Sequence, residues 1–93
     1  MFLGVDWSRR GDYITQKHGI TPAEANEALA DPYRVALDPD PASETGLTVR
    51  IIGRSESHGV LLTVIVLDYD GHEYGVNAWK SSPKDRRRYK EID

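Results

Sequence analysis

The segment VLLTVIVLD, residues 60–68, constrains the fold of this chain more than any other feature. It is apolar at every position except Thr63 and Asp68. Because successive side chains of a β-strand point to opposite faces, a strand of this composition is apolar on both faces. Such a strand belongs in the centre of a sheet that is covered on both sides.

Three other segments are rich in β-branched and aromatic residues and are bounded by Gly, Asp, Ser or His. They are YRVAL (33–37), LTVRIIG (47–53) and EYGVNAW (73–79). Asp70-Gly71 stands between the last two of the four strand segments and predicts a type I′ hairpin. We therefore expect four consecutive strands that form an antiparallel sheet.

Two helices are expected before these strands. The first has Ser8 as its N-cap and ends before Gly19, a residue suited to the left-handed position after a helix. The second begins with a Thr-Pro-x-Glu sequence at residues 21–24, which combines a capping box with proline at the first helical position. It ends at Asp31-Pro32, because the residue before a proline is disfavoured in a helix.

A third helix closes the chain, with Ser82 as its cap, Pro83 at the first position and Asp85 as the acid of a capping-box variant. Residues 2–6 are expected to form a short strand. The order of elements is then β-α-α-β-β-β-β-α. This order predicts a single α+β domain over residues 1–93, with an antiparallel sheet and helices mainly on one face.

Composition argues against several classes of site. The chain of 93 residues contains no cysteine, so disulfides and thiolate metal sites are excluded. The three histidines, His18, His58 and His72, are too far apart in sequence for a metal-ligand pair, and we expect neither a metal ion nor a cofactor. No segment has the pattern of a signal peptide or a membrane span, so we expect a cytoplasmic protein without membrane contacts.

Charge is segregated along the chain. Residues 1–79 carry 6 basic and 12 acidic side chains, whereas residues 80–93 carry 6 basic and 3 acidic ones. Within this basic end, Lys84, Arg87 and Arg88 have the spacing of a stripe on one helix face. Two interpretations stay open: a solvated amphipathic helix anchored to the core, or a binding surface for nucleic-acid phosphates.

Metal-free cleavage of RNA is a reaction that these residue types could support. The ribose 2′-hydroxyl attacks the adjacent phosphorus when a protein supplies a proton acceptor, an acid and cations. Arg50, Lys80 and Arg86 are the candidates for the positive charge. Tyr89, Lys80 or His18 could move protons, and among these residue types only histidine titrates near neutral pH without environmental tuning.

Two segments frame a strand-rich middle that contains VRIIGRS and GVLLTVIVL: KHGITPAEANEALADP (17–32) and VNAWKSSPKDRRRYKE (76–91). Together they resemble the BrnT family of toxins from type II toxin–antitoxin systems, over nearly the whole chain. The resemblance implies a fold like that of the RelE superfamily and a metal-independent ribonuclease that halts translation. It also implies neutralisation by a cognate DNA-binding partner, a BrnA-like antitoxin, in a hetero-oligomer.

Individual positions carry the resemblance. Lys17–Gly19 matches the family's Lys-His-Gly turn, and Lys80 matches the basic position after the last strand. Arg86 and Tyr89 match the arginine and tyrosine of the closing helix. The chain departs from the family along the last strand, where many members read Arg-x-x-Ser-x-Arg. The residues there are Tyr74, Asn77 and Trp79.

Two hypotheses about function follow. In the first, the chain is an endoribonuclease toxin in which Trp79 stacks on an unpaired base of mRNA and His18 or Tyr89 handles protons. The residues expected to contact RNA are Trp79, Asn77, Lys84, Arg87 and Arg88. In the second, the chain is a noncatalytic module that binds the antitoxin or acts as a co-repressor. The acidic body favours the second hypothesis, and the constellation of Lys80, Arg86 and Tyr89 favours the first.

Alternation along the last strand makes one further prediction. It places Tyr74, Val76 and Ala78 on the face opposite to Trp79. We therefore expect Trp79 to be at least partly exposed on the outer face of the sheet, near Arg50.

Overall fold

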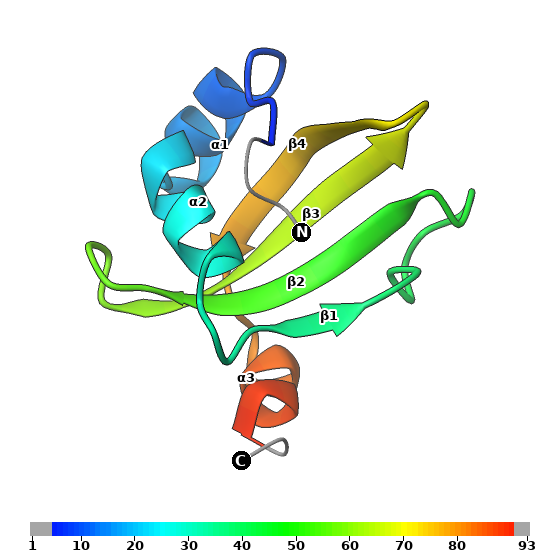
Figure 1. Cartoon of the computed structure of the whole chain (residues 1–93). Coiled ribbons are helices and arrows are strands. Elements are labelled where there is room, and N and C mark those ends of the chain that lie inside the picture. Colours follow the sequence, from blue (N-terminus) through cyan, green and yellow to red (C-terminus); the bar gives the residue numbers. More distant parts are fainter. Residues whose placement is uncertain (1–4, 91–93) are drawn as a thin grey trace.

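The computed structural model of the chain describes residues 5–90 (Figure 1). Its elements are α1 (Gly11–His18), α2 (Pro22–Leu29), β1 (Val35–Leu37), β2 (Thr48–Ser55), β3 (Val60–Tyr69), β4 (His72–Lys80) and α3 (Pro83–Lys90). The strands form one antiparallel sheet in the order β1-β2-β3-β4. The expected α+β class is therefore confirmed, and β3 is a central strand as its composition predicts.

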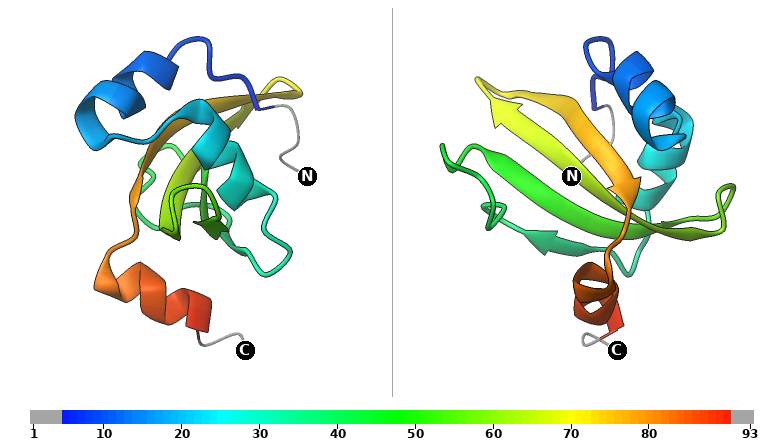
Figure 2. Two further views of the ribbon diagram at one scale, coloured as in Figure 1. Left: turned by 90° about the vertical axis from the view of Figure 1, so that its left-hand side faces the viewer. Right: turned by 180° about the vertical axis from the view of Figure 1, so that it is seen from behind.

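The core lies between the sheet and the two N-terminal helices. Helices α1 and α2 lie on one side of the sheet, which we call the inner face, and the opposite side is the outer face (Figures 1 and 2). The inner face presents alternate aliphatic residues, and burial of each contributes about 1.5–3 kcal/mol. They are Val49 and Ile51 from β2 and Leu62, Val64 and Val66 from β3. The helices add Ile14, Ala25, Ala28 and Leu29.

Two glycines let other groups approach the inner face closely. A Cβ atom on Gly53 would lie 2.1 Å from the carbonyl oxygen of Ala28, so β2 passes directly under the end of α2. A Cβ atom on Gly75 would lie 2.3 Å from the ring of Trp7. Both positions require glycine because any side chain would collide with backbone or with a buried ring.

The second helix begins as its sequence predicts. The Thr21 hydroxyl accepts a hydrogen bond from the amide of Glu24, and the Glu24 carboxylate accepts one from the amide of Thr21. This capping box satisfies donors that would otherwise be unpaired at the helix N-terminus. At the C-terminal end of α1, Gly19 adopts the expected left-handed conformation, with φ at 69°.

The predicted start of the first helix is wrong. Ser8 lies in a turn, where its amide donates to the Asp6 carboxylate, and α1 begins only at Gly11 with Arg10 in the N-cap position. The Ser8 side chain therefore caps nothing. Only Val5 and Asp6 of the strand expected at 2–6 lie within the described residues. Asp6 forms an isolated parallel bridge with Tyr74, so this segment touches the edge of β4.

The hairpin between β3 and β4 is regular at its tip and irregular in its middle. Asp70 and Gly71 have φ values of 53° and 74°, which confirms the predicted type I′ turn. Further along, Ile65 pairs with Asn77 whereas Val66 pairs with Gly75, so Val76 is an extra residue in a β-bulge. The bulge shifts the alternation by one position.

The bulge corrects the predicted face of Tyr74. Tyr74 pairs with Leu67 and Trp79 pairs with Thr63, and both partners belong to the outer-face row of β3. Tyr74 and Trp79 therefore share the outer face, although simple alternation places them on opposite faces. Ala78 is fully buried on the inner face as expected.

Helix α3 lies beyond one end of the sheet rather than against the inner face (Figure 2). The Ser82 hydroxyl accepts from the Asp85 amide, so the predicted cap is present. The Asp85 carboxylate, in contrast, turns toward outer-face residues of β2 and β3. None of the helices formed by residues 5–90 is long and apolar enough to cross a membrane.

Candidate nucleic-acid interface

The outer face carries a group of ion pairs around Arg50, which we call the Arg50 cluster. It consists of Asp40, Arg50, Asp85 and Arg88. The Arg50 Nε atom lies 2.9 Å from Asp40 Oδ1, and its Nη1 atom lies 2.9 Å from Asp85 Oδ2. Arg88, one turn after Asp85, donates to the other Asp85 oxygen at 2.9 Å. Two cations thus share one carboxylate.

The two carboxylates of the Arg50 cluster are buried. The Asp85 side chain is 1% exposed, and it also accepts a hydrogen bond from the Thr63 hydroxyl at 2.9 Å. In residues 5–90, no buried side-chain nitrogen or oxygen lacks a hydrogen-bond partner. A buried carboxylate of this kind is tolerated because its oxygens face cations and donors.

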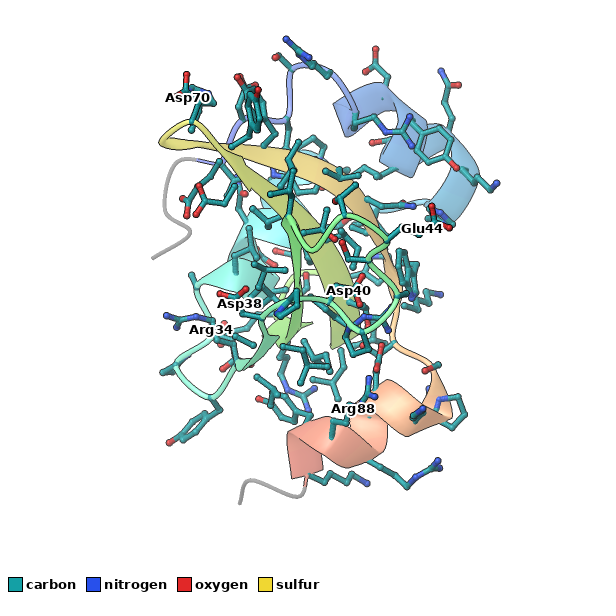
Figure 3. The ribbon with its side chains drawn as sticks, turned by 90° about the vertical axis from the view of Figure 1, so that its right-hand side faces the viewer. Arg34, Asp38, Asp40, Glu44, Asp70 and Arg88 are labelled. Atoms are coloured by element: carbon teal, nitrogen blue, oxygen red, sulfur yellow. The ribbon has the colours of Figure 1, made fainter. Side chains whose placement is uncertain are left out.

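The connection between β1 and β2 closes the Arg50 cluster from outside. Figure 3 shows Asp40 and Glu44 on this connection, which passes in front of the sheet, and Arg88 on α3 beneath it. Asp40 is buried, whereas Glu44 is exposed. Arg50, expected to polarise a phosphate, and Arg88, expected on a solvent-facing stripe, both face carboxylates instead.

Beside this cluster lie four of the expected site residues, His18, Trp79, Lys80 and Arg86, which we call the Trp79 surface. His18 and Trp79 are neighbours, whereas Lys80 ends the strand in the row of Leu62, on the side opposite to Trp79, and Arg86 follows on α3. Trp79 is half-buried, and its ring lies 6.2 Å from that of His18 and 5.7 Å from the Arg50 guanidinium. The predicted partial exposure of Trp79 near Arg50 is confirmed. One aromatic ring is thus flanked by an imidazole and a cation.

The row of rings continues onto α1. The rings of His18 and Tyr13 are 6.1 Å apart in an edge-to-face arrangement. The Arg10 guanidinium lies 3.9 Å from the Tyr13 ring centre, and the Lys17 ammonium lies 5.6 Å from it. Cations on aromatic faces are held at the surface without a carboxylate partner. The edge of the sheet beside α1 therefore combines exposed charge with aromatic surface.

Lys80 and Arg86 lie on either side of the connection between β4 and α3. Lys80 is exposed at the end of β4, and Arg86 donates from Nη1 to the carbonyl oxygen of Ser81 at 2.9 Å. This bond fixes the exposed Arg86 side chain next to the residue that follows Lys80. Lys84 and Arg87 are exposed on α3. Preorganised cations of this kind suit a phosphate.

Asn77 is a weaker candidate for an RNA contact. It is half-buried on the outer face, where it pairs with Ile65, and its side-chain oxygen accepts from the amide of Ala78 at 2.9 Å. The side-chain amide group still provides donors on this face.

Tyr89 lies apart from the Trp79 surface. Its hydroxyl donates to Asp31 Oδ2 at 2.7 Å, on the connection between α2 and β1. Burial raises the pKa of Asp31, but hydrogen bonds from the amides of Tyr33 and Arg54 and from Tyr89 outweigh it, so the pKa lies below the ordinary 3.8. A pocket of about 480 Å³ opens here, lined in part by Tyr33, Arg54 and Tyr89. The structure thus separates Tyr89 from His18.

The other histidines serve separate contacts. His58 Nδ1 lies 2.9 Å from a Glu24 oxygen, and His72 Nε2 lies 3.4 Å from Asp6 Oδ2. Hydrogen bonds from the Thr21 amide and from His58 lower the pKa of Glu24. Within the described part of the chain, no group of three or more His, Cys, Asp and Glu side chains could hold a metal ion.

Sequence reasoning missed the acids that organise this region. Asp31 was interpreted only as a helix stop and Asp85 only as a cap, and Asp40 was not singled out. One available signal was that Asp85 is the single acid within the basic run 84–90. Comparison of the chain with models of protein families and with curated proteins gives no match.

Proposed function

We propose that this chain is the toxin of a type II toxin–antitoxin pair, and that it cleaves mRNA in the cytoplasm so that translation stops. The observation that carries the proposal is the position of Trp79, a half-exposed ring between the His18 imidazole and the Arg50 guanidinium. The sequence resemblance to BrnT toxins supports the same conclusion. A closer relation of this α+β fold to the RelE superfamily is part of the proposal.

The chemistry assigned to the Trp79 surface needs no metal ion. An unpaired base stacks on Trp79, and Lys80 and Arg86 bind the adjacent phosphate. His18 removes the proton from the ribose 2′-hydroxyl, whose oxygen then bonds to phosphorus while the bond to the 5′ oxygen breaks. The leaving 5′ oxygen takes a proton from solvent water, and the products are a 2′,3′-cyclic phosphate and a 5′-hydroxyl. His18 takes this role rather than Tyr89, because the Tyr89 hydroxyl is bonded to Asp31.

The proposed partner is a BrnA-like antitoxin that covers residues 79–90. The exposed cations of this segment favour an acidic or amphipathic segment of the partner, which would exclude RNA by sterics and charge together. A solution structure or hydrogen-exchange map of the complex should show protection over residues 79–90. Full exposure of this segment in an inhibited complex would contradict the steric account.

One observation favours a second candidate, a noncatalytic module that binds the antitoxin. Arg50 is 16% exposed and faces two carboxylates, so one of the expected phosphate-binding cations is neutralised within the fold. A domain of this kind could keep its partner surface without cleaving RNA.

Expression without an antitoxin separates the two candidates. We expect the unmutated protein to arrest growth and to degrade purified single-stranded RNA, and His18→Ala to lower the cleavage rate by about a hundredfold. His58→Gln is the matched control, because His58 lies between β2 and β3 and bonds to Glu24 of α2, and this variant should leave cleavage unchanged. No cleavage by a folded unmutated protein, together with retained antitoxin binding, would establish the noncatalytic module.

A further inference from the structure

A second surface pocket lies at the end of the sheet opposite to α3. It has a volume of about 430 Å³, within the usual range of small-molecule sites. Figure 3 shows Asp70 at the tip of the β3–β4 hairpin and Arg88 at the opposite end of the molecule. The pocket is lined by Arg9, Arg10, Leu67, Tyr69, Tyr74, Gly75 and Val76.

The lining combines aromatic faces with positive charge. Tyr69 is 59% exposed, one of the few large rings in the described residues that is so open to solvent. The Arg9 guanidinium lies 5.3 Å from the centre of the Tyr74 ring. Arg10 is fixed by a 3.0 Å hydrogen bond from its Nε atom to the carbonyl oxygen of Val76. Two rings and the Arg9 guanidinium thus line one hollow, and Arg10, whose guanidinium lies over the Tyr13 ring, borders it.

Of the acids around the pocket, Asp70 is exposed at the hairpin tip, and none of the others forms a salt bridge with Arg9 or Arg10 among the described residues. Asp68 pairs with Glu73, and both alternate with outer-face residues, so they lie on the inner side of the hairpin. Asp6 lies 3.4 Å from His72 rather than against an arginine. An anionic ligand that approaches the pocket can therefore reach Arg9, which is exposed.

The bulge at Val76 aligns this pocket with the Trp79 surface. Because of the bulge, Tyr74 and Trp79 lie on the same face of β4. The strand rise places them about 15 Å apart, which a few nucleotides can span. Sequence-independent binding of single strands commonly uses such a series of aromatic rings with flanking cations.

We propose that this pocket is a second subsite for single-stranded RNA, in which Tyr69 and Tyr74 hold one base and Arg9 contacts a phosphate. The strand then runs along β4 to the Trp79 surface. This inference rests on the proposed function for its ligand class, but it concerns residues that the cleavage chemistry does not use. The subsite would contribute affinity and direction to the bound strand.

The test is fluorescence anisotropy with labelled single-stranded RNA of 12 nucleotides and with a dinucleotide, under conditions where cleavage is blocked by His18→Ala. The variant is Arg9→Ala with Tyr69→Ala, and both side chains lie at the surface. We expect about tenfold or greater loss of affinity for the long RNA. The salt dependence should also weaken, with the slope reduced by about 0.7 for one lost phosphate contact. Affinity for the dinucleotide, which is short enough to occupy the Trp79 surface alone, should not change.

The matched control is Tyr33→Ala with Arg54→Ala, which removes one exposed ring and one exposed cation from the other pocket. If the Arg9/Tyr69 variant and its His18→Ala parent bound RNA with equal affinity, the second subsite would be overturned. If Trp79→Ala still weakened RNA binding in that case, the proposed function would stand. Loss of antitoxin affinity alone in the Arg9/Tyr69 variant would also overturn it and assign the pocket to the partner. If neither the His18→Ala protein nor the unmutated protein bound RNA, both proposals would be overturned.

Discussion

The Arg50 cluster and the Trp79 surface are neighbours, but their cations face different groups. Arg50 and Arg88 face the buried carboxylate of Asp85, and Arg50 also faces Asp40. Lys80 and Arg86 lie exposed at the connection between β4 and α3, where Arg86 is held only by a backbone carbonyl among its described contacts. A count of basic residues therefore does not give the charge available to a ligand. One buried acid, Asp85, is paired with two of these cations within the fold.

The most damaging way to break the Arg50 cluster is Asp85→Ala. Removing this carboxylate leaves Arg50 and Arg88 without their shared partner and Thr63 without its acceptor, so we expect a loss of about 3–5 kcal/mol of unfolding free energy. Urea denaturation measures the change. Glu44→Ala is the control, because Glu44 is exposed on the β1–β2 connection and its removal should change stability by less than about 0.5 kcal/mol. Similar midpoints for the two variants would show that the cluster does not hold α3.

Substitutions on the Trp79 surface should lower RNA cleavage without lowering the stability of the fold. Lys80→Ala with Arg86→Ala should lower RNA cleavage by about a hundredfold or more, or about 3 kcal/mol of activation free energy, because preorganised charge is lost at the reacting phosphate. Growth arrest should disappear while circular dichroism stays unchanged. Lys84→Ala with Arg87→Ala removes two exposed cations from α3 and should only weaken binding in a salt-dependent way. Equal loss in both pairs would reduce the site to a diffuse basic patch.

Tyr89→Phe tests whether a residue outside both the Arg50 cluster and the Trp79 surface affects stability or RNA cleavage. Loss of the hydrogen bond to Asp31 should cost about 0.5–1.5 kcal/mol of stability and leave RNA cleavage intact. The pKa of folded Asp31 lies below 3.8, so its contribution to stability is present above that pH and is lost as the pH falls through the folded value. The difference between Tyr89→Phe and the unmutated protein should therefore shrink below about pH 4. A large fall in cleavage would instead return a catalytic role to Tyr89.

The smallest expected effect is that of Glu24→Ala, which sets a baseline for an acid on the surface of a helix. It removes half of the capping box of α2 and the His58 contact, and we expect a cost of about 0.5–1 kcal/mol. Thermal unfolding would measure it, with Glu24→Gln retaining part of the cap. A cost as large as that of Asp85→Ala would mean that burial does not distinguish the two acids.

Local patterns were sufficient for most of the fold. The capping box at residues 21–24, the type I′ turn and the two-faced apolar strand each depend on neighbours in sequence, and each is present. The bulge at Val76 could not be predicted, because it depends on how β4 pairs with β3 and on the contact of Trp7 with Gly75. The start of α1 was missed because Ser8 resembles a cap, although its amide is engaged by Asp6.

The position of Trp79 beside Arg50 was predictable from the sequence, but the contacts of Arg50 and Tyr89 with distant acids were not. The sequence indicated partial exposure of Trp79 near Arg50, and the structure brings them within 5.7 Å. It did not indicate that Asp40 and Asp85 would neutralise Arg50, because these residues are 10 and 35 positions away along the chain. Nor did it separate Tyr89 from His18, since that depends on a contact across 58 positions.

The extra residue at Val76 changes which residue numbers of β4 face outward. Before Val76 the even-numbered Tyr74 faces outward, and after it the odd-numbered Asn77 and Trp79 do. Deletion of Val76 would leave a regular strand in which Tyr74, Asn77 and Trp79 still face outward. A strand of the present length that paired without the bulge would instead turn Tyr74 inward, onto the side where Trp7 already occupies the space above Gly75. Positions 72–75 and 77–80 therefore cannot be compared with those of a relative of the same length by strand alternation unless the relative carries the same bulge. Such a relative without the bulge would present a different set of side chains to the outer face while showing nearly the same sequence.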